Sequence, residues 1–393
     1  MHPFPDPARR ARLARRHGLH PGHRLADAVS VTAAMTVLHA TEAPTVHLAV
    51  AARSEGVTIA DVDAELYRRR TLVKQLAMRR TLFVFPRDLL PAAWGSASAR
   101  VAAAEGRRLA ADIEKAGAAA DGSAWLEEAA AAVLERLAAG EELDAATLRA
   151  EVPALATRIV FGSGKWSQEA PVAPRLLTVL GARGLLVRGS NGGHWRLSKP
   201  RWTPMASWLG EEPALLPEAA GYAELVRRWL WTFGPGTESD LAWWLGATKA
   251  AVRRAPADVA AVGVRLDSGE TGWVLPGDEV PDAPVEPWGA LLPTLDPTTM
   301  GWKQRDFYLD PDDVPFLFDS AGNAGTTAWW DGRVVGCWVQ DADGTVRVVY
   351  RRDPGPDARA ALAHEAARLT DWMGGEVVTN VFASPQVRGE RLR

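Results

Sequence analysis

The chain has 393 residues, a formal net charge of −3 and a single cysteine, Cys337. One cysteine excludes a disulfide framework and any zinc site built from cysteines, and it fits a reducing compartment. The start of the chain lacks the apolar segment of a signal peptide, and no later stretch is apolar for long enough to span a bilayer, so we expect a cytoplasmic protein.

The N-terminal part of the chain is basic. Residues 1–110 carry 17 Lys and Arg against 9 Asp and Glu, whereas the rest of the chain is acidic. This asymmetry indicates a localised face for phosphate groups, although basic helix faces are as often simply solvated. We interpret residues 1–28 as a basic arm that precedes the first folded module.

A first module is predicted from apolar residues at helical spacing. Its helices are Val29–Ala40, Pro44–Ser54 and Thr58–Ala77, and the strand Thr81–Pro86 closes it. The stretch Pro86–Asp121 is rich in alanine and predicts a helical connector.

A second module is predicted between Ser123 and Ser198. Its helices are Ser123–Gly140, a short helix that begins at the capping residue Asp144, and Ala173–Gly184. Leu185–Gly189 and His194–Ser198 are expected to pair as a hairpin, and the Pro-containing stretch Lys199–Ala220 is interpreted as a linker.

The clearest module is Tyr222–Pro276. Two helices, Tyr222–Gly234 and Glu238–Leu245, precede a basic helix capped by Thr248, and a hairpin follows. Helices followed by a hairpin are typical of a winged helix, which presents one helix and one wing to a duplex. Repetition of this order favours double-stranded DNA as the partner, and winged helices that dock proteins are the alternative.

After Pro276 the pattern changes to short strands. Asp331-Gly332 and Asp343-Gly344 indicate hairpin turns, and the helix Asp357–Gly375 precedes the strand Glu376–Phe382. We therefore predict an α+β fold with three tandem winged-helix modules and a small C-terminal β-barrel-like domain. The expected boundaries are 1–28, 29–122, 123–220, 221–280 and 281–393.

Signals for metal or cofactor chemistry fail on inspection. GSGKW at Gly162–Trp166 lacks the upstream glycine and the Ser or Thr of a P-loop, and His364 lacks the second histidine of a zinc-protease helix. We expect no metal and no cofactor. What remains is LHATEAP, in which His39 and Thr41 flank a small residue and could hold a water, although a lone histidine there is more often a surface or capping residue.

Two longer stretches resemble a known family. RRRTLVKQLAMRRTLFVFP at Arg68–Pro86 and the long segment Leu291–Trp338, with its YLDP and GNAGTTAWWDGRVVG elements, are similar to AlkZ/YcaQ-type winged-helix DNA glycosylases. The resemblance runs from about Gly18 to Val381. It implies three winged helices and a C-terminal barrel around a DNA-sized channel, and removal of alkylated purines, including bulky adducts and interstrand crosslinks, without a metal or cofactor.

The resemblance also implies site residues. The family's water-positioning pair, Gln-x-Gln or Gln-x-Asp, aligns with His39 and Thr41, so this chain departs from the pattern. His39 is expected to act as a base or as a water anchor, and Thr41 only as a hydrogen-bonding group. The family's strand motif Met-Arg-x-Thr-Leu-His reads MRRTLF here, with Phe83 in place of the final histidine.

Five arginines are expected to contact DNA: Arg79, Arg80, Arg253, Arg254 and Arg305. For Arg79 and Arg80 a solvated strand end is an equally good interpretation. The predicted function is a monomeric, nucleoid-associated, monofunctional DNA glycosylase for alkylated purines such as N7-alkylguanine and N3-alkyladenine. The alternative is a non-catalytic winged-helix protein that binds lesions or regulates transcription.

Overall fold

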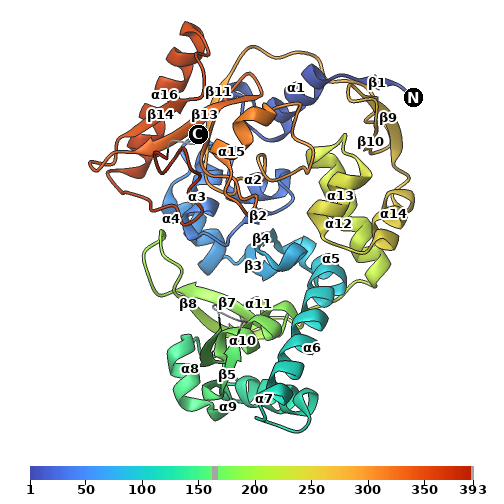
Figure 1. The fold of residues 1–393 in the computed structure, drawn as a ribbon, viewed down its shortest axis with the longest axis vertical. Helices are drawn as coiled ribbons and strands as arrows, with labels where there is room; N and C mark the ends of the chain where they lie inside the picture. Colours follow the sequence, from blue (N-terminus) through green and yellow to red (C-terminus); the bar gives the residue numbers. More distant parts are fainter. Residues whose placement is uncertain (162–166, 391–393) are drawn as a thin grey trace.

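The computed structural model has a mixed α+β fold, in which helices alternate with sheets of two to four strands (Figure 1). It describes residues 1–161 and 167–390, so the Gly162–Trp166 stretch lies outside the described residues. No helix within these two ranges is long and apolar enough to cross a membrane. The predicted α+β class is confirmed.

The N-terminal residues, expected as a basic arm, are folded onto a distant part of the chain. They form strand β1 (Pro3–Phe4) and helix α1 (Asp6–Arg16). β1 pairs in parallel with β9 (Val262–Leu266), which pairs with β10 (Thr271–Val274). The buried ring of Phe4 packs in a small apolar cluster with β9 and β10, and this contact holds the segment in place.

The first module differs from its prediction at two places. Its elements are α2 (Ala28–Ala34), β2 (Leu38–His39), α3 (Ala43–Ala51), α4 (Ile59–Asp63), β3 (Leu72–Leu76) and β4 (Leu82–Pro86). The helix predicted to reach Ala40 ends at Ala34, and the end of the helix predicted up to Ala77 is strand β3. Both β2 and β3 pair with β4, so sheet formation outweighs the helical pattern of the two segments.

The connector is helical as predicted, and it leads to a second module at one end of the molecule (Figure 1). The connector holds α5 (Leu90–Ala93) and α6 (Ala99–Lys115). The module holds α7 (Gly122–Arg136), α8 (Ala145–Glu151), α9 (Pro153–Ala156) and α10 (Ala173–Ala182), which share a separate hydrophobic core. Asp144 caps α8 by accepting a hydrogen bond from the Thr147 amide, which confirms that predicted cap.

The strands of the second module were predicted only in part. β7 (Leu186–Asn191) pairs with β8 (Pro200–Pro204) and not with His194–Ser198. The Asn191 side chain bonds to carbonyls of residues 193, 194 and 197 and accepts from the Lys199 amide, so the segment predicted as a strand is the turn itself. A second hairpin, β5 (Arg158–Phe161) with β6 (Gln168–Pro171), was not predicted.

The third module has the predicted elements in the predicted order. After α11 (Met205–Leu209) come α12 (Glu218–Phe233), α13 (Glu238–Leu245) and α14 (Lys249–Asp258), followed by the β9–β10 hairpin. The hydroxyl of Thr248 caps α14 by accepting from the Ala251 amide. The winged-helix arrangement of the three modules and their boundaries stay predictions.

The C-terminal part is a sheet covered by one helix. It contains β11 (Gly289–Leu292), α15 (Val314–Leu317), β12 (Thr327–Trp330), β13 (Arg333–Gln340), β14 (Val346–Tyr350) and α16 (Pro356–Met373). The sheet order is β11-β12-β13-β14, so the described strands form an open sheet and not the expected closed barrel. Glu376–Phe382, predicted as a strand, is irregular, because amides of this segment bond to the side chains of Gln340 and Glu42.

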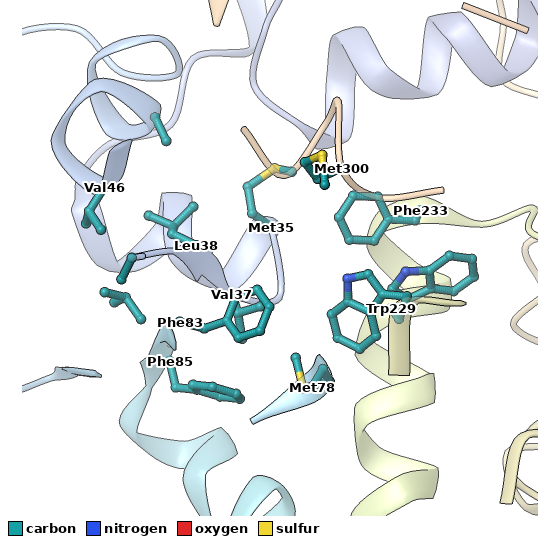
Figure 2. Packing of buried hydrophobic residues seen from close by; sticks show 14 of the residues in the cluster. Met35, Val37, Leu38, Val46, Met78, Phe83, Phe85, Trp229, Phe233 and Met300 are labelled. Carbon is teal, nitrogen blue, oxygen red and sulfur yellow. The ribbon is translucent and has the colours of Figure 1, made fainter. Parts of the chain in front are cut away.

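The largest hydrophobic core joins parts of the chain that are far apart in sequence. Figure 2 shows Met78 and Phe83 of the first module near Trp229 of α12, with Met300 of the C-terminal part close by. All four residues are at most 4% exposed. Buried side chains at this density leave little freedom for the backbone, so this core fixes the β2–β4 pair on which the candidate site is built.

Candidate active site and nucleic-acid interface

His39 lies at the end of β2 and is buried. Its backbone pairs with Phe83 on β4, and the two ring centroids are 4.6 Å apart. Burial and, to a smaller extent, the positive charge of Arg79 lower the pKa of His39 to about 3. The imidazole is therefore neutral near neutral pH, and its Nδ1 atom has no hydrogen-bond partner among the described residues. This state suits a water anchor better than a proton acceptor.

Thr41 lies in the loop between β2 and α3 and is exposed. The loop is attached to β4 by a hydrogen bond of 2.9 Å from the Ala40 amide to the Leu82 carbonyl. Thr41 is part of the wall of a cleft of about 850 Å³. The opposite wall consists of residues from α6, the β5–β6 hairpin and α10. The first module and the second module therefore enclose the cleft between them.

The cleft is basic. Its lining includes six basic residues, Arg80, Arg108, Lys115, Arg158, Arg175 and Arg188, and three acidic residues, Glu105, Asp112 and Glu169. Each acidic residue pairs with an arginine of the lining. Lys115 and Arg188 pair with no acidic side chain in the described chain. Apolar side chains of β5 face the same cleft, among them Val160, which is 59% exposed. Such a surface fits a polyanion that also carries flat apolar groups.

The predicted DNA-contacting arginines fall into two groups. Arg80, Arg253 and Arg254 are exposed and pair with Glu105, Glu238 and Asp258, respectively. Arg79 and Arg305 form no ion pair with any described Asp or Glu. Their guanidinium carbons lie 4.0 and 5.2 Å from the ring centroid of Trp243 on α13. The structure thus brings Arg79 and Arg305 together and places Arg253 and Arg254 on α14.

Glu42 was missed by sequence reasoning. It precedes α3 but makes no capping hydrogen bond with its side chain. Instead the carboxylate is buried, Oε1 accepts from the Val381 amide, and Oε2 has no partner within the described chain. Burial raises the pKa of Glu42 to about 7. The only sequence signal was its place beside His39-Ala40-Thr41, which an exposed helix-start glutamate would share.

The described residues contain no group of three or more His, Cys, Asp or Glu side chains that could hold a metal ion. The arrangement therefore offers hydrogen-bonding groups for a water and basic groups for phosphates.

The family model for DNA glycosylase AlkZ-like proteins matches residues 32–372, so the chain belongs to the AlkZ-like DNA glycosylase family. This confirms the resemblance inferred from the sequence. Among solved structures, the Streptomyces sahachiroi DNA glycosylase AlkZ is similar in fold, with a TM-score of 0.70 and 20% sequence identity over 95% of this chain and 98% of that one. No curated protein matches in sequence.

Proposed function

We propose that the protein is a monofunctional DNA glycosylase that hydrolyses the N-glycosidic bond of alkylated purines in double-stranded DNA. The observation that carries the proposal is the position of Thr41 on the wall of the basic cleft, two residues after the buried His39. By the resemblance in sequence, these two residues take the place of the family's water-positioning pair, which supports the proposed role. Family membership supports action on DNA, and the alkylated purine is the finer part of the proposal.

The proposed reaction needs little assistance from protein side chains. An N7- or N3-alkylated purine is already a cation, so the bond from C1′ to nitrogen breaks with its electrons moving to the base, and a cationic sugar forms. A water held by His39 and Thr41 then adds to C1′ and gives up its proton to solvent. The neutral state of His39 agrees with this role, because a neutral imidazole does not repel the cationic sugar.

We also propose how the modules are arranged around DNA. Three winged helices would surround one duplex, and because the modules differ from one another, one chain would suit one lesion better than a symmetric operator. We therefore propose a monomer that acts without a metal or cofactor. Bulky adducts and interstrand crosslinks are proposed as further substrates, since the cleft of about 850 Å³ exceeds what a methylated base needs.

The test is single-turnover incubation with a labelled duplex that holds one N7-methylguanine, with and without alkaline cleavage of the product. Strand breaks that appear only after alkali support a monofunctional glycosylase, whereas breaks without alkali show that the enzyme also cleaves the backbone. No release, together with tighter binding to the lesion duplex than to undamaged DNA, would support the non-catalytic alternative. The His39→Ala/Thr41→Ala double variant is the control for contaminating activity.

A further inference from the structure

Three arginine side chains meet at the C-terminal end of α13. The Arg79 guanidinium carbon lies 4.0 Å from the ring centroid of Trp243, and that of Arg305 lies 5.2 Å from the same centroid and 4.6 Å from the Phe318 ring. Arg100 joins them at Gly246, where an added Cβ would lie 2.8 Å from Cγ of Arg79 and 3.4 Å from Nη2 of Arg100. The three arginines come from segments far apart in the chain.

These half-buried arginines lack acidic partners. No Asp or Glu side chain pairs with any of the three, although all acidic side chains of the protein lie in the described part of the chain. The Nε atoms of Arg79, Arg100 and Arg305 are buried without a hydrogen-bond partner. A buried donor without a partner destabilises the folded state, and more so when it belongs to a charged group, so the free protein holds this cluster in an unfavourable state.

The backbone at Arg79 adds to that cost. The chain reverses between β3 and β4 through Arg79 and Arg80, whose φ angles of 54° and 58° are in the left-handed region. Asn and Gly are the usual residues of such a turn, and other residues held there are strained and cluster at functional sites. Burial and the nearby charge of Arg305 lower the pKa of Arg79 to about 10, which is a further sign of repulsion within the cluster.

We propose that Arg79 and Arg305, packed on Trp243, bind one phosphodiester of the DNA backbone beside the nucleotide whose base is removed. This inference rests on the proposed function. Guanidinium groups match the geometry of phosphate oxygens by donating two parallel hydrogen bonds, and stacking on the Trp243 ring holds both groups in place. The turn that holds Arg79 leads into β4, which pairs with the His39 strand, so the bound phosphate lies next to the reacting sugar.

The phosphate also has a chemical consequence. Unpaired arginines close to C1′ would oppose the positive charge that develops on the sugar, because like charges interact strongly in a water-poor site. The single negative charge of a bound phosphodiester offsets one of the two positive charges of Arg79 and Arg305, so the DNA backbone lowers the repulsion that a cationic transition state meets at this site. The reaction would then be favoured only where an intact backbone is seated.

The test is a coupling experiment between protein and DNA. Binding is measured to a series of duplexes that all hold a tetrahydrofuran abasic-site analogue. In each duplex a different phosphate next to the analogue is replaced by a neutral methylphosphonate, and one duplex keeps all its phosphates. One methylphosphonate is expected to weaken wild-type binding by about 10-fold to 100-fold, the loss of charge-assisted hydrogen bonds. The variant Arg79→Gln/Arg305→Gln is expected to bind the unmodified duplex as weakly as the wild type binds the duplex with that one methylphosphonate. Its affinity is expected to fall no further when the same phosphate is replaced. Independent, additive losses at every position would overturn the proposal.

Control variants distinguish a lost phosphate contact from a general loss of charge or of folding. Arg347→Gln, which alters an exposed arginine paired with Asp341, is expected to leave the methylphosphonate effect intact. Arg79→Lys and Arg305→Lys keep the charge. If these variants recover part of the coupling that the glutamine variant loses, then the glutamine variant has lost a contact and is not simply misfolded. Because binding is measured without base release, coupling with no excision of N7-methylguanine would sustain the clamp and reject the glycosylase. Excision without coupling would sustain the glycosylase and reject the clamp.

Discussion

The imidazole of His39 and the phenyl ring of Phe83 are cross-strand partners with centroids 4.6 Å apart. By the resemblance in sequence, the corresponding positions of the family hold glutamine and histidine, so this chain has its imidazole on β2 and not on β4. The two departures fall on one ring pair. We propose that His39 compensates for the histidine missing from β4, since either strand can place an imidazole in the same small volume.

We expect the reciprocal change, His39→Gln with Phe83→His, to keep base release within about tenfold of the wild type. Each single change is expected to cost more than about tenfold, because His39→Gln removes the imidazole of the ring pair and Phe83→His places two imidazoles in one buried volume. Single-turnover release of N7-methylguanine by the four proteins measures the coupling between the two sites. A double variant as slow as the product of the single losses would show that the two positions act independently.

His39→Ala is expected to slow base release by about 100-fold, and Thr41→Ala by less, because solvent can replace the hydrogen bond of the exposed Thr41 hydroxyl but not that of the buried imidazole. Binding to the duplex should survive both changes, since phosphate contacts supply most of the affinity. The exposed His23→Ala is the matched control. Equal rates in all of these proteins would mean that the pair takes no part in the reaction.

The pH dependence of base release distinguishes the two roles of His39. Its pKa is lowered to about 3, so the imidazole stays neutral above about pH 4 and gains a proton only in strong acid. We therefore expect no step near pH 6.5 that disappears in the His39→Ala variant. A rate that falls below pH 6.5 only in proteins with His39 would instead identify a base with an ordinary pKa.

Local signals predicted much of the fold. Caps such as Thr248 and Asp144 located helix starts correctly because a cap depends on neighbours in sequence. Residues 72–76 were assigned to a helix because their strand character comes from pairing with β4, a tertiary contact. The β5–β6 hairpin was missed for the same reason, since its short strands carry no apolar alternation of their own.

The sequence could name the residues of the candidate site, whose roles stay predictions, but it could not predict how they are arranged. His39, Thr41, Arg79 and Arg305 could be named from the sequence through the resemblance. The contact of both arginines with Trp243 could not, because it joins three segments that only the folded core brings together. The unusual state of Glu42 likewise depends on a C-terminal segment closing over it.

Glu42 is expected to make stability depend on pH. Its pKa is raised from 4.5 to about 7, so the folded protein holds this proton more tightly than the unfolded chain does. The free energy of unfolding should therefore fall as pH rises from about 4.5 through about 7, by on the order of 2–3 kcal/mol, and then level off. Urea denaturation of the wild type and Glu42→Gln across this range measures the difference.

The Glu42→Gln variant should lose this pH-dependent component and be the more stable protein at pH 8, because its amide needs no proton and can still accept from the Val381 amide. Glu212→Gln, at an exposed position, should follow the wild type at every pH. If Glu42→Gln also follows the wild type at every pH, then Glu42 titrates alike in the folded and unfolded chains.

Arg53 and Asp296 form a fully buried ion pair that attaches the end of α3 to the segment after β11, with Nη2–Oδ1 and Nη1–Oδ2 distances of 2.6 and 2.8 Å. Asp296→Ala leaves a buried guanidinium without its carboxylate, so we expect a loss of about 3–5 kcal/mol in the free energy of unfolding. Asp341→Ala removes the partner of the exposed Arg347 and should cost less than about 1 kcal/mol.

Arg53→Met/Asp296→Leu removes both charges and should recover much of the loss, because the penalty comes from the unpaired charge and not from the missing attraction. Urea denaturation of the four proteins decides the matter. A double variant as unstable as Asp296→Ala would mean that the pair stabilises this junction through its own attraction and hydrogen bonds.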